Sequence, residues 1–348
     1  MIAQPPRSLR LRLDPEALAG NWRALDRLSG TARAGAAVKA DAYGIGVARA
    51  VPVLREAGCR TFYVAHWSEV ADMLDHAPAS EIVVLHGPTF PDDVAYALAS
   101  GVRPVINSLH QARLWLDAGG GECDLMLDTG INRLGLAPAE VGDPRVARLQ
   151  VETVMSHLAS ADEDSAQNER QRRLFDELAP QVPHRRRSLA NSAAIALGPG
   201  YAYDRTRPGL ALYGGVPRPE LAAEIRQVAH PQAAVLQLRD LAPGDSVGYN
   251  ATFTAERPMR VATVSLGYAD GFLRCWAGRG ALRLGEELLP LLGRVSMDMV
   301  VVDACAARGL REGDWLDVPY HLPQAAERCG LSQYEMLTTL GRRFQRTA

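Results

Sequence analysis

Lys39 stands at the end of a short apolar run, in a position where an amine could act as a nucleophile. The run 36–38 is typical of a buried strand, and a Tyr-Gly-x-Gly turn at 43–46 follows before a helical pattern resumes at Val47. Burying an ammonium without a partner is costly, so burial lowers the pKa of the amine and frees its lone pair for Schiff-base chemistry. The alternative is a structural lysine that extends its charged end from a strand into solvent.

Polar side chains also follow many of the other apolar runs. They are His66, His86, Asn107, Asp128, His157 and Asn191-Ser192. In a barrel of parallel strands the carboxyl ends all face one mouth, which is where such folds hold their chemistry. A lone histidine after a strand is more often structural, but several convergent polar ends, one of them carrying Lys39, favour a site.

The elements that must position these residues are β-rich runs that alternate with helical patterns. Asp14 and Pro15 are typical of a helix start, and apolar residues recur at helical spacing from Leu18 to Leu28. Eight short β-rich runs are expected at 36–38, 61–65, 82–85, 103–106, 124–127, 151–155, 188–190 and 210–213. Helical segments separate them at 68–76, 91–100, 109–118 and 168–178, among others. We therefore predict an α/β fold with an N-terminal (β/α)8 barrel; a doubly wound sheet is the alternative, but it lacks its G-x-G-x-x-G turn.

Beyond about residue 225 the pattern changes to strands separated by turns. Runs at 233–239, 260–266, 288–292 and 295–303 are interrupted by Gly-containing turns at 243–245, 267–271 and 312–314. This predicts a mainly antiparallel β domain with a short helix near 333–340. The predicted domains are 1–225 for the barrel, whose first strand (Leu9, Leu11, Leu13) could pair with the β domain, and 226–348.

Composition excludes several classes of protein. The net charge is −2, from 38 basic and 40 acidic residues, so we expect neither a nucleic-acid nor a membrane partner. The only basic cluster, 185–187, is interpreted as a solvated loop before a strand. Five cysteines (59, 123, 275, 305 and 329) lack metal-site spacing, so no metal is expected. Scattered thiols and the absence of an apolar leader favour a cytoplasmic protein.

The ten residues 37–46, which read AVKADAYGIG, resemble the cofactor-lysine signature of alanine racemases, two-domain fold-type III enzymes that use pyridoxal 5'-phosphate (PLP). The resemblance continues in order over most of the chain. The matching segments are DTGINRLG (128–135), SHLASAD (156–162), ANSA (190–193), RPGLALYG (207–214), SLGYADGF (265–272) and GRVSMD (293–298).

The resemblance implies a role for each matching residue. Lys39 would be the Schiff-base lysine, Tyr43, Ser192, Gly209 and Leu210 would hold the phosphate, His157 would lie beside the cofactor ring, and Arg207 would face its pyridine nitrogen. Arg133 and Met297 would border the substrate, because a guanidinium fork suits a carboxylate. Without the resemblance, Arg133 would be a surface arginine, Ser192 a helix N-cap and Tyr268 a turn tyrosine.

The implied activity is interconversion of L- and D-alanine, an isomerase reaction that supplies a peptidoglycan precursor. Racemisation removes a proton from one face of Cα and delivers one to the other, so two bases are needed. By resemblance, Lys39 would serve the D face and Tyr268, from the β domain of a second subunit, the L face. His157 would hydrogen-bond Tyr268 across the subunits, with Arg207 behind it. We therefore expect a head-to-tail homodimer with shared sites that takes a small amino acid.

Two positions depart from the family pattern. Met126 stands where many members carry a lysine that can be carbamylated, so something else must orient Arg133. Gly341 stands where many members have a tyrosine that touches the phosphate and narrows the entrance. A glycine there would open the pocket and allow serine or other small amino acids.

Other functions remain open from the sequence. A racemase of broader specificity, or a fold-type III decarboxylase using Cys275 or Cys305 as an acid, would share the barrel. A non-enzymatic PLP-binding module would not need the β domain. A Schiff-base aldolase without PLP would leave Ser192 and Gly209 without a role.

Overall fold

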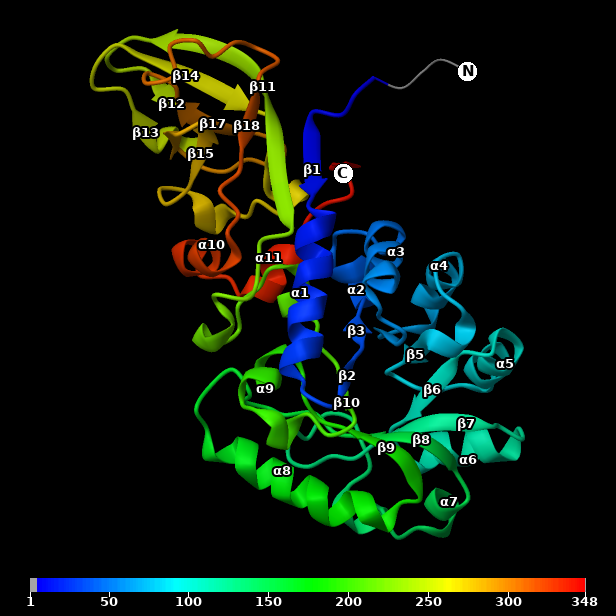
Figure 1. Ribbon diagram of the computed structural model, residues 1–348. Coiled ribbons are helices and arrows are strands. Elements are labelled where there is room, and N and C mark those ends of the chain that lie inside the picture. The colour runs from blue at the N-terminus through cyan, green and yellow to red at the C-terminus, as the bar shows by residue number, and fades with distance from the viewer. Residues whose placement is uncertain (1–4, 348) are drawn as a thin grey trace. The chain divides into compact units, whose positions relative to one another are not determined.

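The computed structural model describes residues 5–347 and divides into two compact units. Residues 16–226 form the first unit. The segment that ends at residue 15 joins residues 227 onward in the second (Figure 1). We call them the barrel unit and the β unit.

Seven strands of the barrel unit pair in chain order, and every pair is parallel. They are β3 (Ala36–Ala37), β4 (Phe62–Val64), β5 (Ile82–Val84), β6 (Arg103–Ile106), β7 (Glu122–Met126), β8 (Gln150–Met155) and β9 (His184–Ser188). Most of their side chains are buried, and the runs of β3, β4 and β5 are accordingly continuously apolar rather than alternating. The parallel strand–helix repeat predicted from the sequence is confirmed.

Helices connect the strands (Figure 1). They are α1 (Pro15–Leu28), α2 (Lys39–Tyr43), α3 (Val47–Ala57), α4 (Val70–Leu74), α5 (Pro91–Ser100), α6 (Leu109–Asp117), α7 (Pro144–Ala147), α8 (Ala166–Leu178) and α9 (Ser192–Ala196). Local chemistry sets their starts: Ser108, Ser165 and Asn191 each accept an amide hydrogen of the first turn with their side chains.

The expected eighth strand at 210–213 is wrong. Those residues form a 3₁₀ helix, in which Leu212 N–H donates to Gly209 O at 2.9 Å. The eighth position is taken earlier, by β10 (Arg205–Thr206), which pairs in parallel with β2 (Arg33–Ala34). Backbone hydrogen bonds from Ala37 to Pro208 and from Arg207 to Ala190 (both 2.8 Å) extend this pairing toward β3 and β9. Residues 210–213 (LALY) are all buried. A short buried helix and a short buried strand have the same apolar pattern, so the sequence alone does not distinguish them.

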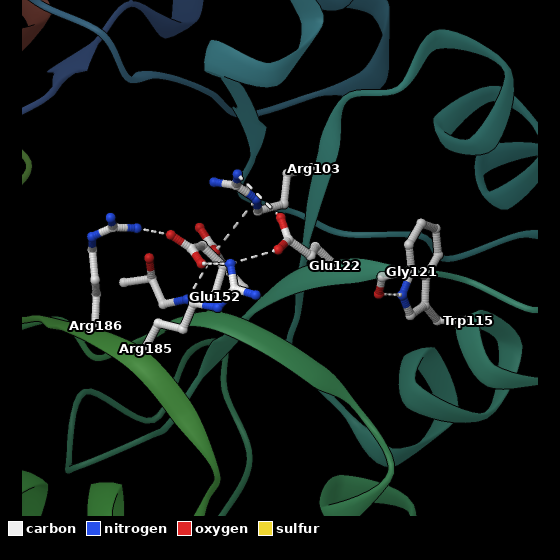
Figure 2. A network of polar contacts seen from close by, with 9 residues as sticks. Arg103, Trp115, Gly121, Glu122, Glu152, Arg185 and Arg186 are labelled. Carbon is white, nitrogen blue, oxygen red and sulfur yellow. Dashed lines mark hydrogen bonds and ion pairs between the residues drawn. The ribbon is translucent and has the colours of Figure 1, made fainter.

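The basic cluster 185–187 lies within β9 and not in a loop, and the strand expected at 188–190 begins earlier, at His184. Arginines occupy a strand here because carboxylates on neighbouring strands compensate them, as Figure 2 shows. Arg185 Nη1 lies 2.9 Å from Glu122 and 3.3 Å from Glu152, which also pairs with Arg186. Trp115 and Gly121 close the adjacent turn with a 3.0 Å hydrogen bond. This network gathers near the amino ends of β7–β9, away from the carboxyl ends.

The β unit is a mainly antiparallel sheet built on one long strand, β11 (Ala229–Leu241). Pairing runs from β11 through β14 (Met259–Val264), β17 (Val300–Asp303), β16 (Glu287–Leu292), β15 (Ala281–Leu284) and β18 (Trp315–Asp317), and returns to β11. β1 (Leu9–Leu13) pairs antiparallel with β11 and parallel with β19 (Gln345–Thr347). A small hairpin, β12 (Ser246–Val247) and β13 (Phe253–Thr254), and two helices, α10 (Leu322–Cys329) and α11 (Gln333–Thr338), complete the unit.

The core of the β unit packs Leu241, Val247, Ala255, Met259, Val261 and Leu292 together. The run 295–303 was expected to be one strand, but only its second half, β17, is extended and paired. Residues 295–299 instead form a loop in which Met297 and Met299 are exposed. A loop that displays two methionines, within a unit whose other apolar residues are largely buried, invites a functional explanation.

Candidate active site

Lys39 is the first residue of α2 and directly follows the end of β3. Burial, followed by the positive charge of Arg133, lowers its pKa, while Glu69 acts in the opposite direction. An amine with a lowered pKa keeps more of its neutral, nucleophilic form at neutral pH. It is also the only lysine in the sequence, so no other side-chain amine can compete for an aldehyde.

The backbone after Lys39 adopts a left-handed turn. Ala40, Asp41, Ala42 and Tyr43 have φ between 52° and 55°, a conformation that costs non-glycine residues roughly 1–2 kcal/mol each. Two carboxylates hold it in place. Asp41 Oδ1 accepts the Val47 amide at 2.8 Å, and Glu69 accepts the Ala40 amide at 2.5 Å. Backbone strain of this kind gathers at functional sites. Here the strained turn brings Tyr43 back toward the barrel.

Glu69 is a residue that the sequence reasoning missed. Its second oxygen accepts the amides of Ala65 and His66 at 2.7 and 3.0 Å, so one carboxylate joins the end of β4 to the segment after Lys39. An acidic residue three positions after a strand-end polar residue is the capping-box pattern, which could have revealed it.

Tyr43, Ser192, Gly209 and Leu210 lie together. The Tyr43 ring stacks on Tyr213 with centroids 4.8 Å apart, and Gly209 passes so close to the Tyr43 hydroxyl that a Cβ would overlap it. Ser192 Oγ accepts the amides of Gly209 at 2.9 Å and Ala211 at 3.2 Å. The Leu210 amide between them has no acceptor within residues 5–347. The hydroxyls of Tyr43 and Ser192 thus lie beside the Leu210 amide at a glycine turn, and this arrangement is a suitable cradle for a phosphate.

Arg207 is buried and directly follows β10. Two short hydrogen bonds fix its side chain. Nη1 donates to Ser188 Oγ and Nη2 donates to Ser156 O, both at 2.5 Å. Its Nε has no partner in the described part of the chain. The Nε–H and one N–H on each Nη therefore remain as donors on a guanidinium that is held in place, so a ligand atom beside Nε can be bound in a defined direction.

His157 follows β8, in the same cationic region. Burial first, and then the positive charges of Arg207, Arg133 and Lys39, lower the pKa of His157 to about 3. The imidazole is therefore neutral near pH 7. Gln171 of α8 holds this corner, because its Nε2 donates to His157 O at 3.1 Å and its Oε1 accepts the Ala159 amide at 2.9 Å.

Arg133 is exposed on the loop after β7, and it makes no hydrogen bond or ion pair within the described residues. Asp128 orders this loop, since its Oδ1 accepts the amides of Gly130, Ile131 and Asn132 at 2.8–3.1 Å. Met126 is buried below the loop, where its backbone carbonyl accepts the Leu136 amide at 2.9 Å. The backbone around Asp128, rather than a modified lysine, thus presents Arg133.

The remaining strand-end residues divide into two groups. His66 and His86 pack edge to face with centroids 4.2 Å apart, and burial, His66 and Lys39 lower the pKa of His86. Asn107 is structural, because its amide donates to Leu85 O and Val105 O at 3.0 Å. Among residues 5–347 no group of three or more His, Cys, Asp or Glu side chains could hold a metal ion. No helix within those residues is long and apolar enough to span a membrane.

In the β unit, the structure brings Tyr268 and Met297 together. The Tyr268 amide donates to Ser296 O and the Ala269 amide to Met297 O, both at 3.0 Å. Gly267 allows this approach, since a Cβ there would overlap the Met297 carbonyl. Tyr268 is partly exposed, with the Arg274 guanidinium 5.2 Å from its ring centroid, and 53% of Met297 is exposed.

Gly341 does not open a pocket, contrary to the expectation from the sequence. Its amide donates to Asp270 O at 3.2 Å, and a Cβ would lie 2.9 Å from Ala269 O and 3.1 Å from Asp270 Cα. The glycine is therefore a close-packing position against the Tyr268 turn. The argument for a wider substrate range loses its support.

The barrel unit fits a PLP-like cofactor. It offers one amine for an aldehyde, a cradle at Ser192, Gly209 and Leu210 for a phosphate, and the Nε–H of Arg207 for a ring nitrogen. A guanidinium placed at that nitrogen would leave it largely unprotonated.

Known proteins share this architecture. Residues 13–217 match the family model for the alanine racemase N-terminal domain, and residues 228–348 match that for the C-terminal domain. Alanine racemase of Methylobacterium nodulans is 42% identical, with 99% of this chain and 97% of that protein covered. That of Acidiphilium cryptum is 40% identical over 97% of each.

Two solved structures give the same result. Alanine racemase from Bartonella henselae, with covalently bound pyridoxal phosphate, superposes with a TM-score of 0.91 at 31% identity, covering 98% of this chain and 99% of that one. The biosynthetic alanine racemase from Pseudomonas aeruginosa gives 0.88 at 34% identity with the same coverage. The family models span both units, and these relatives match over nearly their whole length. The chain therefore belongs to the alanine racemase family.

Proposed function

We propose that this protein is a PLP-dependent alanine racemase that interconverts L- and D-alanine. The observation that carries the proposal is the sole lysine of the chain, with a lowered pKa, on a barrel mouth that also presents the Ser192–Gly209 cradle and Arg207. When bound, PLP would attach to the amino acid and withdraw electrons from Cα, which makes the Cα proton removable.

Each residue then has a stated task. Lys39 Nζ would hold or release the Cα proton on the D face, and Tyr268 Oη would do so on the L face. Arg133 would bind the substrate carboxylate, with Met297 beside it. Arg207 would hold the ring nitrogen without protonating it, which limits electron withdrawal and suppresses competing reactions such as transamination. Neutral His157 could accept the hydrogen bond of a phenol, which helps Tyr268 to act as a base.

A homodimer with shared sites is part of the proposal. The Lys39 half of the machinery belongs to the barrel unit and the Tyr268 half to the β unit. Exposed Met297 and Met299 lie on the loop 295–299, whose Ser296 carbonyl accepts the Tyr268 amide, and exposed apolar residues beside a functional group are typical of a surface that another chain covers. All five cysteines are free thiols, which supports a cytoplasmic location.

The decarboxylase alternative has less support. Cys305 is occupied by Arg260, whose amide donates to its sulfur at 3.3 Å and whose carbonyl accepts from it at 3.7 Å. Burial, followed by the neighbouring Cys329, raises the pKa of Cys275. Neither thiol belongs to the Tyr268–Met297 segments.

The test is subunit complementation. Lys39→Ala and Tyr268→Phe proteins, each inactive alone, are mixed under conditions that exchange subunits. With shared sites, each heterodimer regains one intact site, so a 1:1 mixture recovers about a quarter of the wild-type activity per subunit. Absence of recovery, with exchange verified by mass spectrometry, would refute the sharing.

A parallel measurement tests the cofactor. Borohydride should erase the visible absorption band of the purified protein and fix one label per chain on Lys39. Because no other lysine exists, label found elsewhere could only lie on the α-amine. A protein that stays colourless with added PLP would refute the cofactor assignment and the reaction with it.

A further inference from the structure

Arg343 makes the densest set of charged hydrogen bonds near Tyr268. Its Nε donates to Asp270 Oδ1 at 2.6 Å and its Nη2 to Asp270 Oδ2 at 2.8 Å, a two-pronged contact. The remaining Nη1 donates to Asp298 Oδ1 at 2.6 Å. All three nitrogens of the guanidinium are therefore engaged, in the fork geometry that makes Arg–carboxylate pairs strong and directional.

The two carboxylates belong to the two segments that the proposed reaction uses. Asp270 closes the turn that carries Tyr268, and its Oδ2 also accepts the Gly267 amide at 3.0 Å. Asp298 directly follows Met297. We call the turn 267–271 and the loop 295–299 the phenol turn and the methionine loop.

Asp270 is deeply buried, with a side chain only 1% exposed, whereas that of Asp298 is half exposed. A buried carboxylate needs a cationic partner, and losing that partner leaves an uncompensated charge inside the protein. Asp270 and then Asp298 raise the pKa of Arg343, so the guanidinium stays charged. The contact with Asp270 is thus one that the phenol turn depends on, and Asp298 extends it to the methionine loop.

The backbone that carries Arg343 is held independently of its side chain. Arg7 Nη1 donates to the carbonyls of Arg342 at 2.8 Å and Phe344 at 3.2 Å, on either side of Arg343. The Gly341 amide is bound to Asp270 O. Removing the Arg343 guanidinium therefore removes the side-chain hydrogen bonds to Asp270 and Asp298, leaving the phenol turn and the methionine loop joined only by backbone contacts, while the C-terminal segment stays held.

We propose that Arg343 is a positioning residue for Tyr268: its guanidinium locks the phenol turn to the methionine loop and so fixes the direction of the phenol. The proposal rests on the racemase function inferred above. Arg343 touches neither cofactor nor substrate and acts only through Asp270 and Asp298.

The variants are Arg343→Gln, which removes the charge, and Arg343→Lys, which keeps the charge but lacks the planar fork that makes the two-pronged contact with Asp270. Arg342→Gln is the matched control, because the neighbouring side chain is exposed and makes no hydrogen bond or ion pair within residues 5–347. The first readout is hydrogen–deuterium exchange by mass spectrometry, which needs no activity. We expect faster exchange in both 267–271 and 295–299 for Arg343→Gln, an intermediate effect for Arg343→Lys, and wild-type rates for Arg342→Gln.

The second readout is the kinetic isotope effect on the holoenzyme. The equilibrium between the enantiomers is fixed, so kcat/KM must fall equally in both directions, by about 10- to 100-fold if the phenol is misplaced by about an ångström. The isotope effects separate the two bases. If Tyr268 becomes slow, α-deuterated L-alanine shows a larger effect than in wild type, and α-deuterated D-alanine a smaller one.

Two results would overturn the proposal. One is unchanged exchange in both segments of Arg343→Gln. The other is reduced activity with isotope effects that move equally for the two enantiomers, which would mean that Arg343 serves the general stability of the β unit. A wild-type protein that fails to racemise alanine would instead refute the proposed function, and the exchange result would still decide whether Arg343 joins the two segments.

Discussion

The barrel unit and the β unit hold the residues of the proposed reaction in different ways. In the barrel unit, Lys39, His157 and Arg207 lie at or just beyond the ends of parallel strands, where the sheet itself sets their positions. In the β unit, Tyr268 lies on a turn and Met297 on a loop, and hydrogen bonds rather than a strand hold them.

The electrostatics differ as well. The barrel mouth holds three cationic side chains, Lys39, Arg133 and Arg207. The charge of Arg133 lowers the pKa of Lys39, and all three charges lower the pKa of His157. Such a cationic region suits an anionic ligand. The phenol turn instead contains a neutralised cluster, in which one arginine balances two aspartates. The comparison suggests that the barrel binds and the β unit supplies a single, well-aimed group.

The largest effect should come from removing each reactive group in turn. Lys39→Ala and Tyr268→Phe should each lower racemisation by about 10²- to 10⁴-fold, the range expected for a lost acid–base group. They should differ in proton exchange. Tyr268→Phe should still exchange the α-proton of D-alanine with deuterated water, because Lys39 remains, whereas Lys39→Ala should exchange only that of L-alanine, because Tyr268 remains.

Proton NMR of alanine incubated in deuterated water measures this difference. Exchange of L-alanine by Tyr268→Phe at the wild-type rate would contradict the assignment of the two faces. It would also remove the division of labour between the units.

A smaller effect is expected from filling the space at Gly209. A Cβ in Gly209→Ala would overlap the Tyr43 hydroxyl and displace it, along with the amides beside it. We expect PLP affinity to fall by about 10- to 100-fold, equivalent to about 1.4–2.8 kcal/mol, while racemisation at saturating PLP falls less. Titration of the apoprotein by absorbance or fluorescence measures the affinity.

Gly200→Ala is the control for that change, because a Cβ there meets nothing within 4 Å. Equal PLP affinity for Gly209→Ala and Gly200→Ala would show that the cradle does not bind the phosphate. Neither substitution would alter the β unit, so a change in PLP affinity can be assigned to the barrel unit.

The sequence predicted the barrel half well for a physical reason. Strand, turn and reactive residue are adjacent in the chain there, as in the stretch from β3 through Lys39 to Tyr43. It failed where local pattern is ambiguous. The run 210–213 is apolar whether it forms a strand or a 3₁₀ helix, and residues 185–187 form a strand only because Glu122 and Glu152 compensate them.

Contacts between distant segments could not be predicted at all. Glu69 accepts amides from the segment directly after β4 and from the turn after Lys39, and Arg343 contacts Asp270 from 73 positions away. Gly341 was misinterpreted for the same reason. Whether a glycine opens a pocket or permits close packing depends on what lies opposite, here the backbone of Ala269 and Asp270.

The smallest effect concerns the pH dependence of stability and arises from the barrel half alone. In the unfolded chain a histidine titrates near 6.5, whereas burial and neighbouring cations lower the pKa of His157 to about 3. Between these values the unfolded chain binds more protons than the folded chain, so the free energy of unfolding rises with pH. The contribution of His157 to stability is therefore lost progressively as the pH falls below about 6.5. The loss is at most about 1.4 kcal/mol per pH unit.

His157→Gln should remove this contribution, so the variant should lose less stability than wild type between about pH 6.5 and pH 4.5. Urea unfolding of protein without added PLP measures it, with the exposed His321→Gln as control. Other groups titrate in the same range, such as Asp124, whose burial raises its pKa to about 6, but they cancel in the difference between variant and wild type. Parallel stability curves for wild type and His157→Gln would mean that the imidazole is not desolvated among the cations. The contrast between a cationic barrel mouth and a neutralised phenol turn would then fail.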